Sequence, residues 1–495
     1  MSTADSAAMR RVLRNALALV AAYALPRVLT LGAVVLAART LGAARFGAYA
    51  AAGAAAVIMS ILSTAGMQPL LVREIARDQS AAPRLLRSAH RIKTALNVAM
   101  LALLWLAATA VFGLEGEALW AALLLGVGYA VGSYAENLAA YFQAVERMHV
   151  WTVANAAYGI VAGVTGAVLI LLTHSLPWFC AAMVLGHLAA VAWLHRTYRR
   201  DTRAPGVSDV AVRGGAGLDV RALLRAAAPF AAAFLVLTIF YKGDVLVLSR
   251  VRTAADVGVY VAAYKLVDMA HALALAAILA TYPRLARAAV TRGEGERWAG
   301  TRLAELAHLL VAPAAALGLL LREPLIEALY GSPYSGAAVS AAFLIPALVP
   351  LALNLLAGYV LAAADRVKLM AALYGAGVVV KLGAVALAGA RWGAAGAAAV
   401  MLASELALCA ALQVALHRTA HAAAGRRALL PALSVVAACA AAALVPGATL
   451  PVRVVVFTVL VGAAYVTLDV LPAQERAVVR GMLRRRAEPA GEVAP

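Results

Sequence analysis

The sequence predicts an all-α polytopic membrane protein of about fourteen transmembrane helices, arranged as two six-helix lobes followed by two further helices. Three observations support this fold class. The 495 residues are 64% hydrophobic and only 14% charged, with a mean hydropathy of +0.86, whereas soluble proteins contain about 25% charged residues. Apolar runs recur along the whole chain, and a weak internal repeat relates its two halves.

Each apolar run is long enough to cross a bilayer, because about 20 helical residues span roughly 30 Å of hydrocarbon. The first run follows Arg10, Arg11 and Arg14 and exceeds the roughly 7–15 residues of a signal-peptide core, so it is predicted to be a retained span. The predicted spans are 15–38, 47–72, 93–113, 118–142, 150–173, 176–195, 226–249, 257–282, 303–321, 337–363, 368–390, 394–417, 428–446 and 452–471.

The loops between these spans differ in their content of Lys and Arg, which predicts the orientation. If the N-terminus is cytoplasmic, the inner segments contain 32 Lys or Arg residues and the outer loops contain 7. Short cytoplasmic loops are enriched in Lys and Arg. We therefore predict a multi-pass protein of the cytoplasmic (inner) membrane with both termini cytoplasmic.

Two segments 211 positions apart resemble each other. Residues 39–52, after the first span, and residues 250–263, after the seventh, share one Arg, one Gly, one Tyr and four Ala in register. Because six spans separate the copies, both halves enter the membrane from the same side, as in a parallel repeat.

This repeat predicts the domain organisation. We expect an N-terminal lobe over 1–198 with spans 1–6 and a C-terminal lobe over 226–420 with spans 7–12. A basic cytoplasmic linker over 199–225 joins them, two extra spans occupy 421–475, and a cytoplasmic tail covers 476–495.

Several functional classes are disfavoured by the sequence. The net charge of +19 does not indicate nucleic-acid binding, because the cations occupy short loops between apolar runs. Cys180, Cys409 and Cys439 show no paired spacing, which argues against a disulfide framework and a metal site. There is no phosphate-binding Gly-rich loop for ATP. We therefore expect no cofactor, no metal and no catalytic residue.

Two cations lie deep within predicted spans and are candidate substrate ligands. Arg27 follows Pro26 halfway along the first span, and Lys381 lies in the middle of the eleventh. An Arg side chain forms a planar fork that suits phosphate oxygens, and charged residues inside spans are usually functional. Alternatively, Arg27 bonds to carbonyls freed by Pro26 or pairs with Glu136, and Lys381 extends toward an interface.

A second group of charges lies in the helical hairpin 229–271. Its members are candidates for gating or ion coupling, namely Lys242, Asp244, Lys265, Asp268 and His271. Lys265 and Asp268 are spaced to pair locally, and a cross-helix pair between Asp244 and Lys265 is another possibility. The alternative to a gate or an ion relay is a structural salt-bridge network.

Two carboxylates lie within other spans. Glu136 belongs to the fourth span and Glu405 to the twelfth. Each is a candidate for ion coupling, because intramembrane carboxylates can titrate as access alternates. Each could equally be the partner of a buried cation.

Five motifs together resemble the polysaccharide transporters of the multidrug/oligosaccharidyl-lipid/polysaccharide exporter superfamily, which include the O-antigen and exopolysaccharide flippases. Leu-Ala-Ala-Arg-Thr-Leu-Gly-Ala-Ala-Arg-Phe-Gly-Ala-Tyr (36–49) opens the second span, and Gly-Met-Gln-Pro-Leu-Leu-Val-Arg-Glu-Ile-Ala-Arg (66–77) closes it. Asp-Val-Leu-Val-Leu-Ser-Arg (244–250), Val-Gly-Val-Tyr (257–260) and Ala-Tyr-Lys-Leu (263–266) mark spans 7 and 8.

The resemblance implies a secondary-transport flippase that moves undecaprenyl-diphosphate-linked oligosaccharide across the membrane by alternating access, for cell-surface polysaccharide synthesis. Its partners would be the lipid-linked oligosaccharide, membrane lipids and glycosyltransferases or a polymerase of the same pathway. Three alternatives remain: a lipid II flippase, a multidrug or cation antiporter of the same superfamily, and a polyprenyl-linked glycosyltransferase or polymerase. The lipid II flippases carry several arginines in the first lobe, whereas this chain has only Arg27 there.

Overall fold

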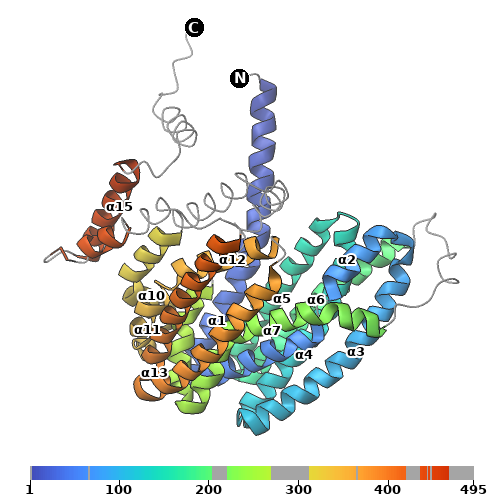
Figure 1. The fold of residues 1–495 in the computed structure, drawn as a ribbon, viewed down its shortest axis with the longest axis horizontal. Helices are drawn as coiled ribbons and strands as arrows, with labels where there is room; N and C mark the ends of the chain where they lie inside the picture. The colour runs from blue at the N-terminus through green and yellow to red at the C-terminus, as the bar shows by residue number, and fades with distance from the viewer. Residues whose placement is uncertain are drawn as a thin grey trace. The chain divides into compact units, whose positions relative to one another are not determined.

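The computed structural model describes residues 3–64, 67–202, 220–268, 311–363, 366–419, 435–442, 444–445 and 449–467. Within these ranges the chain is almost entirely helical and contains no β-strand, so the predicted all-α class is confirmed (Figure 1). The predicted linker and the C-terminal tail lie mostly or wholly outside the described residues, as does His271.

The first predicted loop is a break within one long helical segment. Helix α1 (Thr3–Thr64) contains a residue with non-helical geometry, Gly42, at φ 74° and ψ 171°. A side chain would strain this backbone conformation, which glycine adopts readily. The break separates the first predicted span from the second. Helix α2 (Met67–Arg77) follows, and Asp78 caps the 3₁₀ helix η1 (Gln79–Ala81) through the amide of Ser80.

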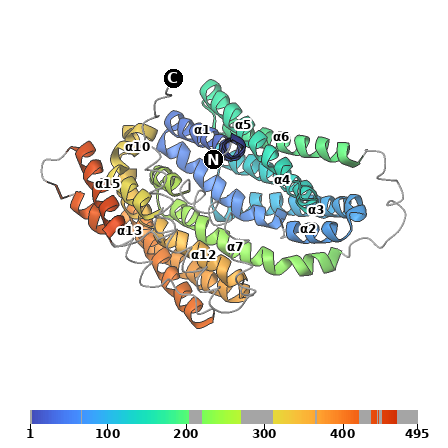
Figure 2. The same ribbon diagram turned by 90° about the horizontal axis from the view of Figure 1, so that it is seen from above.

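The next four helices lie side by side in two perpendicular views (Figures 1 and 2). The turn at residues 145–147 confirms that 118–173 contains two spans. The bounds are Ala82–Leu106 for α3, which continues into the π-helical turn η2 (Ala107–Val111), Gly116–Ala144 for α4, Met148–Thr173 for α5 and Leu176–Thr202 for α6.

Helix α7 (Val220–Val251) begins the second half of the sequence, and residues 254–268 form the helix that follows it. We call the latter helix 254–268. Its start is set by local capping, since the Thr253 hydroxyl donates to the Asp256 carboxylate and accepts from the Asp256 amide. The Thr253 hydroxyl thereby satisfies the Asp256 N–H, one of the groups that a helix start otherwise leaves without a partner.

The predicted span 337–363 consists of two helices, α11 (Ala337–Leu344) and α12 (Leu348–Ala363), bent by 44°. Pro346 lies between them and has no N–H to continue a helix. Before this pair come α10 (Arg322–Tyr330) and the 3₁₀ helix η4 (Ser332–Tyr334). After it come α13 (Val367–Thr419), broken at Gly393, and α15 (Leu450–Thr467).

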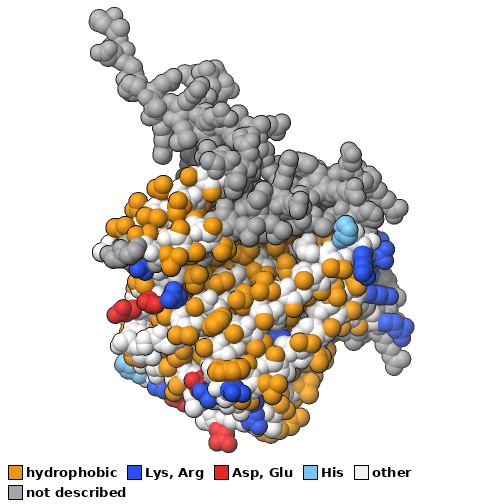
Figure 3. Space-filling model, turned by 60° about the vertical axis from the view of Figure 1, so that its left-hand side comes forward, with side chains coloured by type: hydrophobic (Ala, Val, Ile, Leu, Met, Phe, Trp, Pro, Cys, Tyr) orange, Lys and Arg blue, Asp and Glu red, His pale blue; other side chains and the backbone are white. Residues whose placement is uncertain are grey.

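The described chain has seven helices long and apolar enough to cross a membrane, or eight if the bent pair is one span. Two of them contain the breaks at Gly42 and Gly393 and therefore cover two predicted spans each. Large apolar side chains are exposed along these helices, including Leu172, Val379 and Leu387, each more than 70% exposed. Hydrophobic side chains dominate the described surface in Figure 3, as expected for helices that face lipid.

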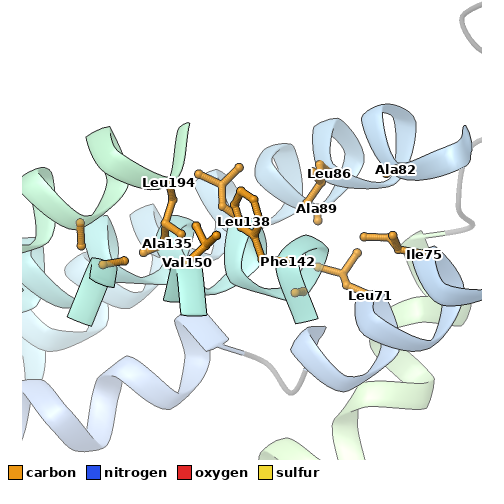
Figure 4. Packing of buried hydrophobic residues seen from close by; sticks show 13 residues of the cluster. Leu71, Ile75, Ala82, Leu86, Ala89, Ala135, Leu138, Phe142, Val150 and Leu194 are labelled. Carbon is orange, nitrogen blue, oxygen red and sulfur yellow. The ribbon is translucent and has the colours of Figure 1, made fainter. Parts of the chain in front are cut away.

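The chain divides into two compact units. The first comprises Met1–Ala262, Ile326–Ala337 and Tyr374–Val400, and the second comprises Ala263–Leu325, Ala338–Leu373 and Met401–Pro495. In the first unit, buried residues of α2 to α6 form a core around Phe142 (Figure 4). In the second, Ala312 and Ala316 pack against residues of 435–442 and of α15. The predicted lobe boundaries at 198 and 226 stay a prediction.

Candidate functional site

Arg27 lies on α1 at a point where the helix packs very closely on α5. A Cβ at Gly159 would lie only 2.3 Å from the Cβ of Pro26. The Thr30 hydroxyl donates to the carbonyl oxygens of Pro26 and Arg27, at 3.0 Å each. Thr30 thus bonds to the carbonyls of the turn that precedes it, a pattern common for hydroxyl side chains within helices.

The Arg27 side chain is exposed, and it forms no hydrogen bond or ion pair with any residue from Pro26 onward whose side chain the structure describes. The alternative in which Arg27 pairs with Glu136 is not observed, because Glu136 binds Lys93; the alternative in which Arg27 bonds to carbonyls freed by Pro26 stays a prediction. The neighbouring Val28 is 60% exposed. Within the first unit, α1 presents a cation that no described protein group neutralises.

Glu136 on α4 pairs instead with Lys93 on α3. The Lys93 ammonium is fully buried and lies 3.1 Å from the Glu136 carboxylate and 2.6 Å from the Ser133 carbonyl oxygen. Asn97, one helical turn after Lys93, donates to the Ala130 carbonyl and the Ser133 hydroxyl, and Ser63 of α1 donates to its side-chain oxygen. These contacts form a polar cluster inside the first bundle of helices.

Lys93 is not among the predicted site residues, because it borders the basic loop before the third predicted span. A signal was present in the spacing. Lys93 and Asn97 share the buried stripe of α3 with Ala89, Met100 and Leu104, at the three- and four-residue intervals of one helical face. A lysine buried on such a stripe needs a carboxylate partner, and the partly exposed Glu136 is that partner.

Lys381 and Asp244 form a second buried ion pair, between α13 and α7. Both side chains have zero exposure, and the Lys381 ammonium lies 3.2 Å from the Asp244 carboxylate. Lys381 also donates to the Phe240 carbonyl oxygen at 2.6 Å and lies 4.7 Å from the centre of the Phe240 ring. Tyr260 of helix 254–268 donates to Asp244 at 2.8 Å. Three helices therefore meet at one carboxylate.

The remaining predicted charges take other positions. Lys265 and Asp268 pair locally at 3.5 Å, as their spacing predicted. Asp244, which was a possible partner of Lys265, is bound by Lys381 and Tyr260. Glu405 of α13 is fully buried and accepts a hydrogen bond from the Asn354 amide of α12 at 2.7 Å. Lys242 is partly buried on α7. In the described part of the chain, no cluster of His, Cys, Asp or Glu could hold a metal ion.

Comparison with known proteins places this arrangement in a family. Residues 12–289, more than half of the chain, match the model of a family described as polysaccharide biosynthesis protein. The chain belongs to this family. No curated protein matches the sequence.

The fold of this polysaccharide biosynthesis family member resembles solved transporters at low sequence identity. The lipid II flippase MurJ in an inward closed conformation is 11% identical, with a TM-score of 0.71 over 92% of this chain and 100% of that chain. An inward-facing multidrug resistance MATE transporter of the MOP superfamily is 15% identical, with a TM-score of 0.66 over 81% and 98%.

A third structure, a MOP superfamily transporter from Pyrococcus furiosus, is 14% identical, with a TM-score of 0.56 over 81% of this chain and 93% of that chain. These matches confirm the predicted fold, and this family member is a helical membrane protein whose fold resembles that of the solved transporters. Among its intramembrane cations, Lys93 and Lys381 are paired with carboxylates, whereas Arg27 has no carboxylate partner among the side chains that the structure describes.

Proposed function

We propose that this protein is a secondary-transport flippase that moves an undecaprenyl-diphosphate-linked oligosaccharide across the cytoplasmic membrane by alternating access. The observation that carries the proposal is the exposed Arg27 on a helix long and apolar enough to span the membrane, with no partner among the side chains that the structure describes. A charged side chain at the bilayer centre costs about 2.5–3.5 kcal/mol on insertion scales, so such residues face a wet cavity or a partner rather than lipid.

The chemistry of Arg27 favours a diphosphate ligand. A guanidinium is permanently charged and donates two parallel hydrogen bonds to phosphate oxygens. A diphosphate that links a polyprenyl chain to a glycan is the one strongly anionic group of such a substrate. We propose that Arg27 binds this group in the cavity and that Lys381, also predicted as a substrate ligand, binds it only if it leaves Asp244.

The carboxylates bear on the alternatives. A multidrug or cation antiporter would use acidic residues to bind its substrate. In the described residues, Glu136 is paired with Lys93, Asp244 with Lys381 and Tyr260, and Glu405 is bound by Asn354. This arrangement supports an anionic substrate over a cationic one. The lipid II alternative is less well supported. Lipid II flippases carry several arginines in the first lobe, whereas Arg27 is the one arginine within the predicted spans of the first lobe of this chain.

No catalytic constellation supports the enzyme alternative among the described residues, and we propose transport without covalent chemistry. The driving force would be the membrane potential or an ion gradient. The predicted partners, glycosyltransferases or a polymerase, would supply the substrate on one side of the membrane and consume it on the other.

The proposal is tested by replacing Arg27 in a strain that lacks the chromosomal copy. We expect Arg27→Gln to reach the membrane in normal amount, to abolish complementation and to leave lipid-linked oligosaccharide at the inner leaflet. Arg87→Gln is the matched control, because Arg87 is exposed and bonds only to the carbonyl of Pro83 in its own helix. Full complementation by Arg27→Gln would remove Arg27 from the substrate site.

A binding experiment separates diphosphate recognition from glycan recognition. Purified protein in detergent is titrated with a polyprenyl diphosphate and with the matching polyprenyl monophosphate, and complexes are counted by native mass spectrometry. We expect the diphosphate to bind more tightly to the unchanged protein and this preference to disappear in Arg27→Gln. Equal binding of both lipids by the unchanged protein would contradict the proposed role.

A further inference from the structure

The two copies of the internal repeat contact each other through their backbones. A Cβ at Gly47 would lie 1.7 Å from the carbonyl oxygen of Ala254, and a Cβ at Gly258 would lie 2.0 Å from the carbonyl oxygen of Ala43. Gly47 and Gly258 are 211 positions apart, and so are Ala43 and Ala254. The contact is therefore reciprocal. The glycine of each copy approaches the alanine that lies four residues before the glycine of the other copy.

Only glycine permits this approach. Any side chain at either position would overlap a backbone oxygen of the opposite copy, and backbone atoms cannot move aside as a flexible side chain can. Each copy contains a small residue, three intervening residues and a glycine, a pattern that lets membrane helices approach closely. Both contacts lie within the first compact unit.

Arginines at equivalent repeat positions each contact a turn that belongs to the opposite half of the sequence. Arg39 donates to the carbonyl oxygens of Ala328 and Leu329, at 2.6 and 2.8 Å, at the C-terminal end of α10, where a helix dipole favours a cation. Arg250 lies against the turn between α3 and α4, with its guanidinium 2.9 Å from the Cβ position of Gly113. Each half of the sequence thus sends one arginine to a turn of the other half.

Aromatic packing supports the Arg39 side of the contact. Tyr334 is 1% exposed and donates to the Ala38 carbonyl oxygen at 2.8 Å. Its ring lies 6.2 Å from that of Phe46, and the Tyr330 ring lies 6.5 Å from Phe46. Tyr330 and Tyr334, which lie between the predicted spans 9 and 10, therefore pack against the turn after the first span.

The distribution of Lys and Arg predicts that all these turns lie on the outer side of the membrane. We propose that the reciprocal contact of Gly47 and Gly258, flanked by Arg39 and Arg250, is the outer gate of this transporter, closed in the present structure. A flippase that works by alternating access must break it to release substrate outward, so this inference rests on the proposed function.

The bonds of the gate suit that role. Hydrogen bonds from an exposed arginine to carbonyl oxygens are each worth about 1.5–3 kcal/mol at most, and water can replace them. The glycine contact itself joins two uncharged backbones and contains no ion pair that opening would have to break. The Asp244–Lys381 pair, in contrast, is fully buried, and through Tyr260 it ties the gate end of helix 254–268 to α7.

The test measures outward access directly and needs no substrate. Ala51 and Ala262 follow the two glycines by four residues on the same helix faces and are 3% and 0% exposed. Each is replaced by Cys in turn, in a background in which Cys180, Cys409 and Cys439 are changed to Ala. Intact cells are then treated with a membrane-impermeant maleimide, and the rate of labelling is measured.

Because a methyl group at Gly258 would overlap Ala43, Gly258→Ala disfavours the closed gate. We expect it to raise the labelling rate of both reporters at least about fivefold, which corresponds to the low end of overpacking costs. Gly53→Ala is the matched control, since a Cβ there meets only the Leu125 side chain at 3.8 Å. Arg39→Ala should also raise labelling, and Arg45→Ala should not, because Arg45 binds Glu117 within its own half.

Two results would overturn the gate. If Gly258→Ala lowers the thermal midpoint of the purified protein and leaves labelling unchanged, the contact is static packing. If Gly53→Ala raises labelling as much as Gly258→Ala, the effect is not specific to the contact. Neither readout depends on Arg27. The proposed gate can therefore be disproved without affecting the proposed substrate site, and the proposed substrate site can be disproved without affecting the gate.

Discussion

At the scale of single residues, the ion pair of Asp244 and Lys381 makes a sharp prediction about stability. Removing one partner leaves the other charged at a site of zero exposure, and breaking a buried pair in this way costs about 3–5 kcal/mol. We expect Lys381→Met and Asp244→Asn each to lower unfolding stability strongly. The double variant should be more stable than the sum of the two losses predicts.

This cycle is measured by denaturant unfolding of the four purified proteins in one detergent. Glu136→Gln is a useful comparison, because Glu136 is 31% exposed and water can solvate part of the group left behind. Its loss should therefore be smaller than that of Asp244→Asn. Additive losses in the Asp244–Lys381 cycle would show that the two charges do not act as a pair.

The charged residues also show what the sequence alone could predict at this scale. The local pair Lys265–Asp268 followed from helical spacing and is confirmed. The partners of Asp244 and Glu136 could not be predicted from helical spacing, because they lie on other helices. Lys381 is 137 residues from Asp244 and Lys93 is 43 residues from Glu136, and no local rule relates residues so far apart in the chain. A buried cation in a span predicts a carboxylate partner, but several carboxylates were available.

At the scale of elements, the breaks at Gly42 and Gly393 divide long helical segments into the predicted spans. Gly42 has φ 74° and ψ 171° with no atom within 4 Å of its Cβ position. Replacing it should therefore act only through the backbone, where such a conformation costs a non-glycine residue about 1–3 kcal/mol. We expect Gly42→Ala to lower the thermal midpoint of unfolding.

Gly32 provides the matched control within the same helix. Its Cβ position is equally open, but its φ is not positive, so Gly32→Ala should raise stability by about 0.5–1 kcal/mol through the better helix propensity of alanine. Both variants are compared by differential scanning fluorimetry in detergent. An unchanged midpoint for Gly42→Ala would mean that the turn relaxes to another backbone conformation.

Element boundaries were predictable where a polar or glycine-containing turn interrupts an apolar run, as between α4 and α5. They were not predictable at 337–363, where apolar residues continue through the bend between α11 and α12. Pro346 was the signal there. Hydropathy measures the length of an apolar run, and it does not register a proline that removes one hydrogen bond inside the run.

At the scale of the whole molecule, the internal repeat carried more information than its seven shared residues suggested. Alanine matches are weak evidence of a repeat in an alanine-rich sequence. Ala43 and Ala254 nevertheless supply the carbonyl oxygens that Gly258 and Gly47 approach. The repeat was detectable from the sequence, but the contact between its two copies was not, because periodicity reports similarity rather than proximity.

The orientation of the chain gives the last prediction, because the outer gate requires the repeat turns to face outward. The 32-to-7 bias of Lys and Arg places the turn before α3 inside and the turn after α5 outside. Gln79 and Thr173 are exposed at these two turns. In the Cys-free background, we expect Thr173→Cys to react with an impermeant maleimide in intact cells and Gln79→Cys to react only after permeabilisation. The reverse pattern would invert the topology and place the contact of Gly47 and Gly258 on the cytoplasmic side, where it would close the entrance for substrate instead of its exit.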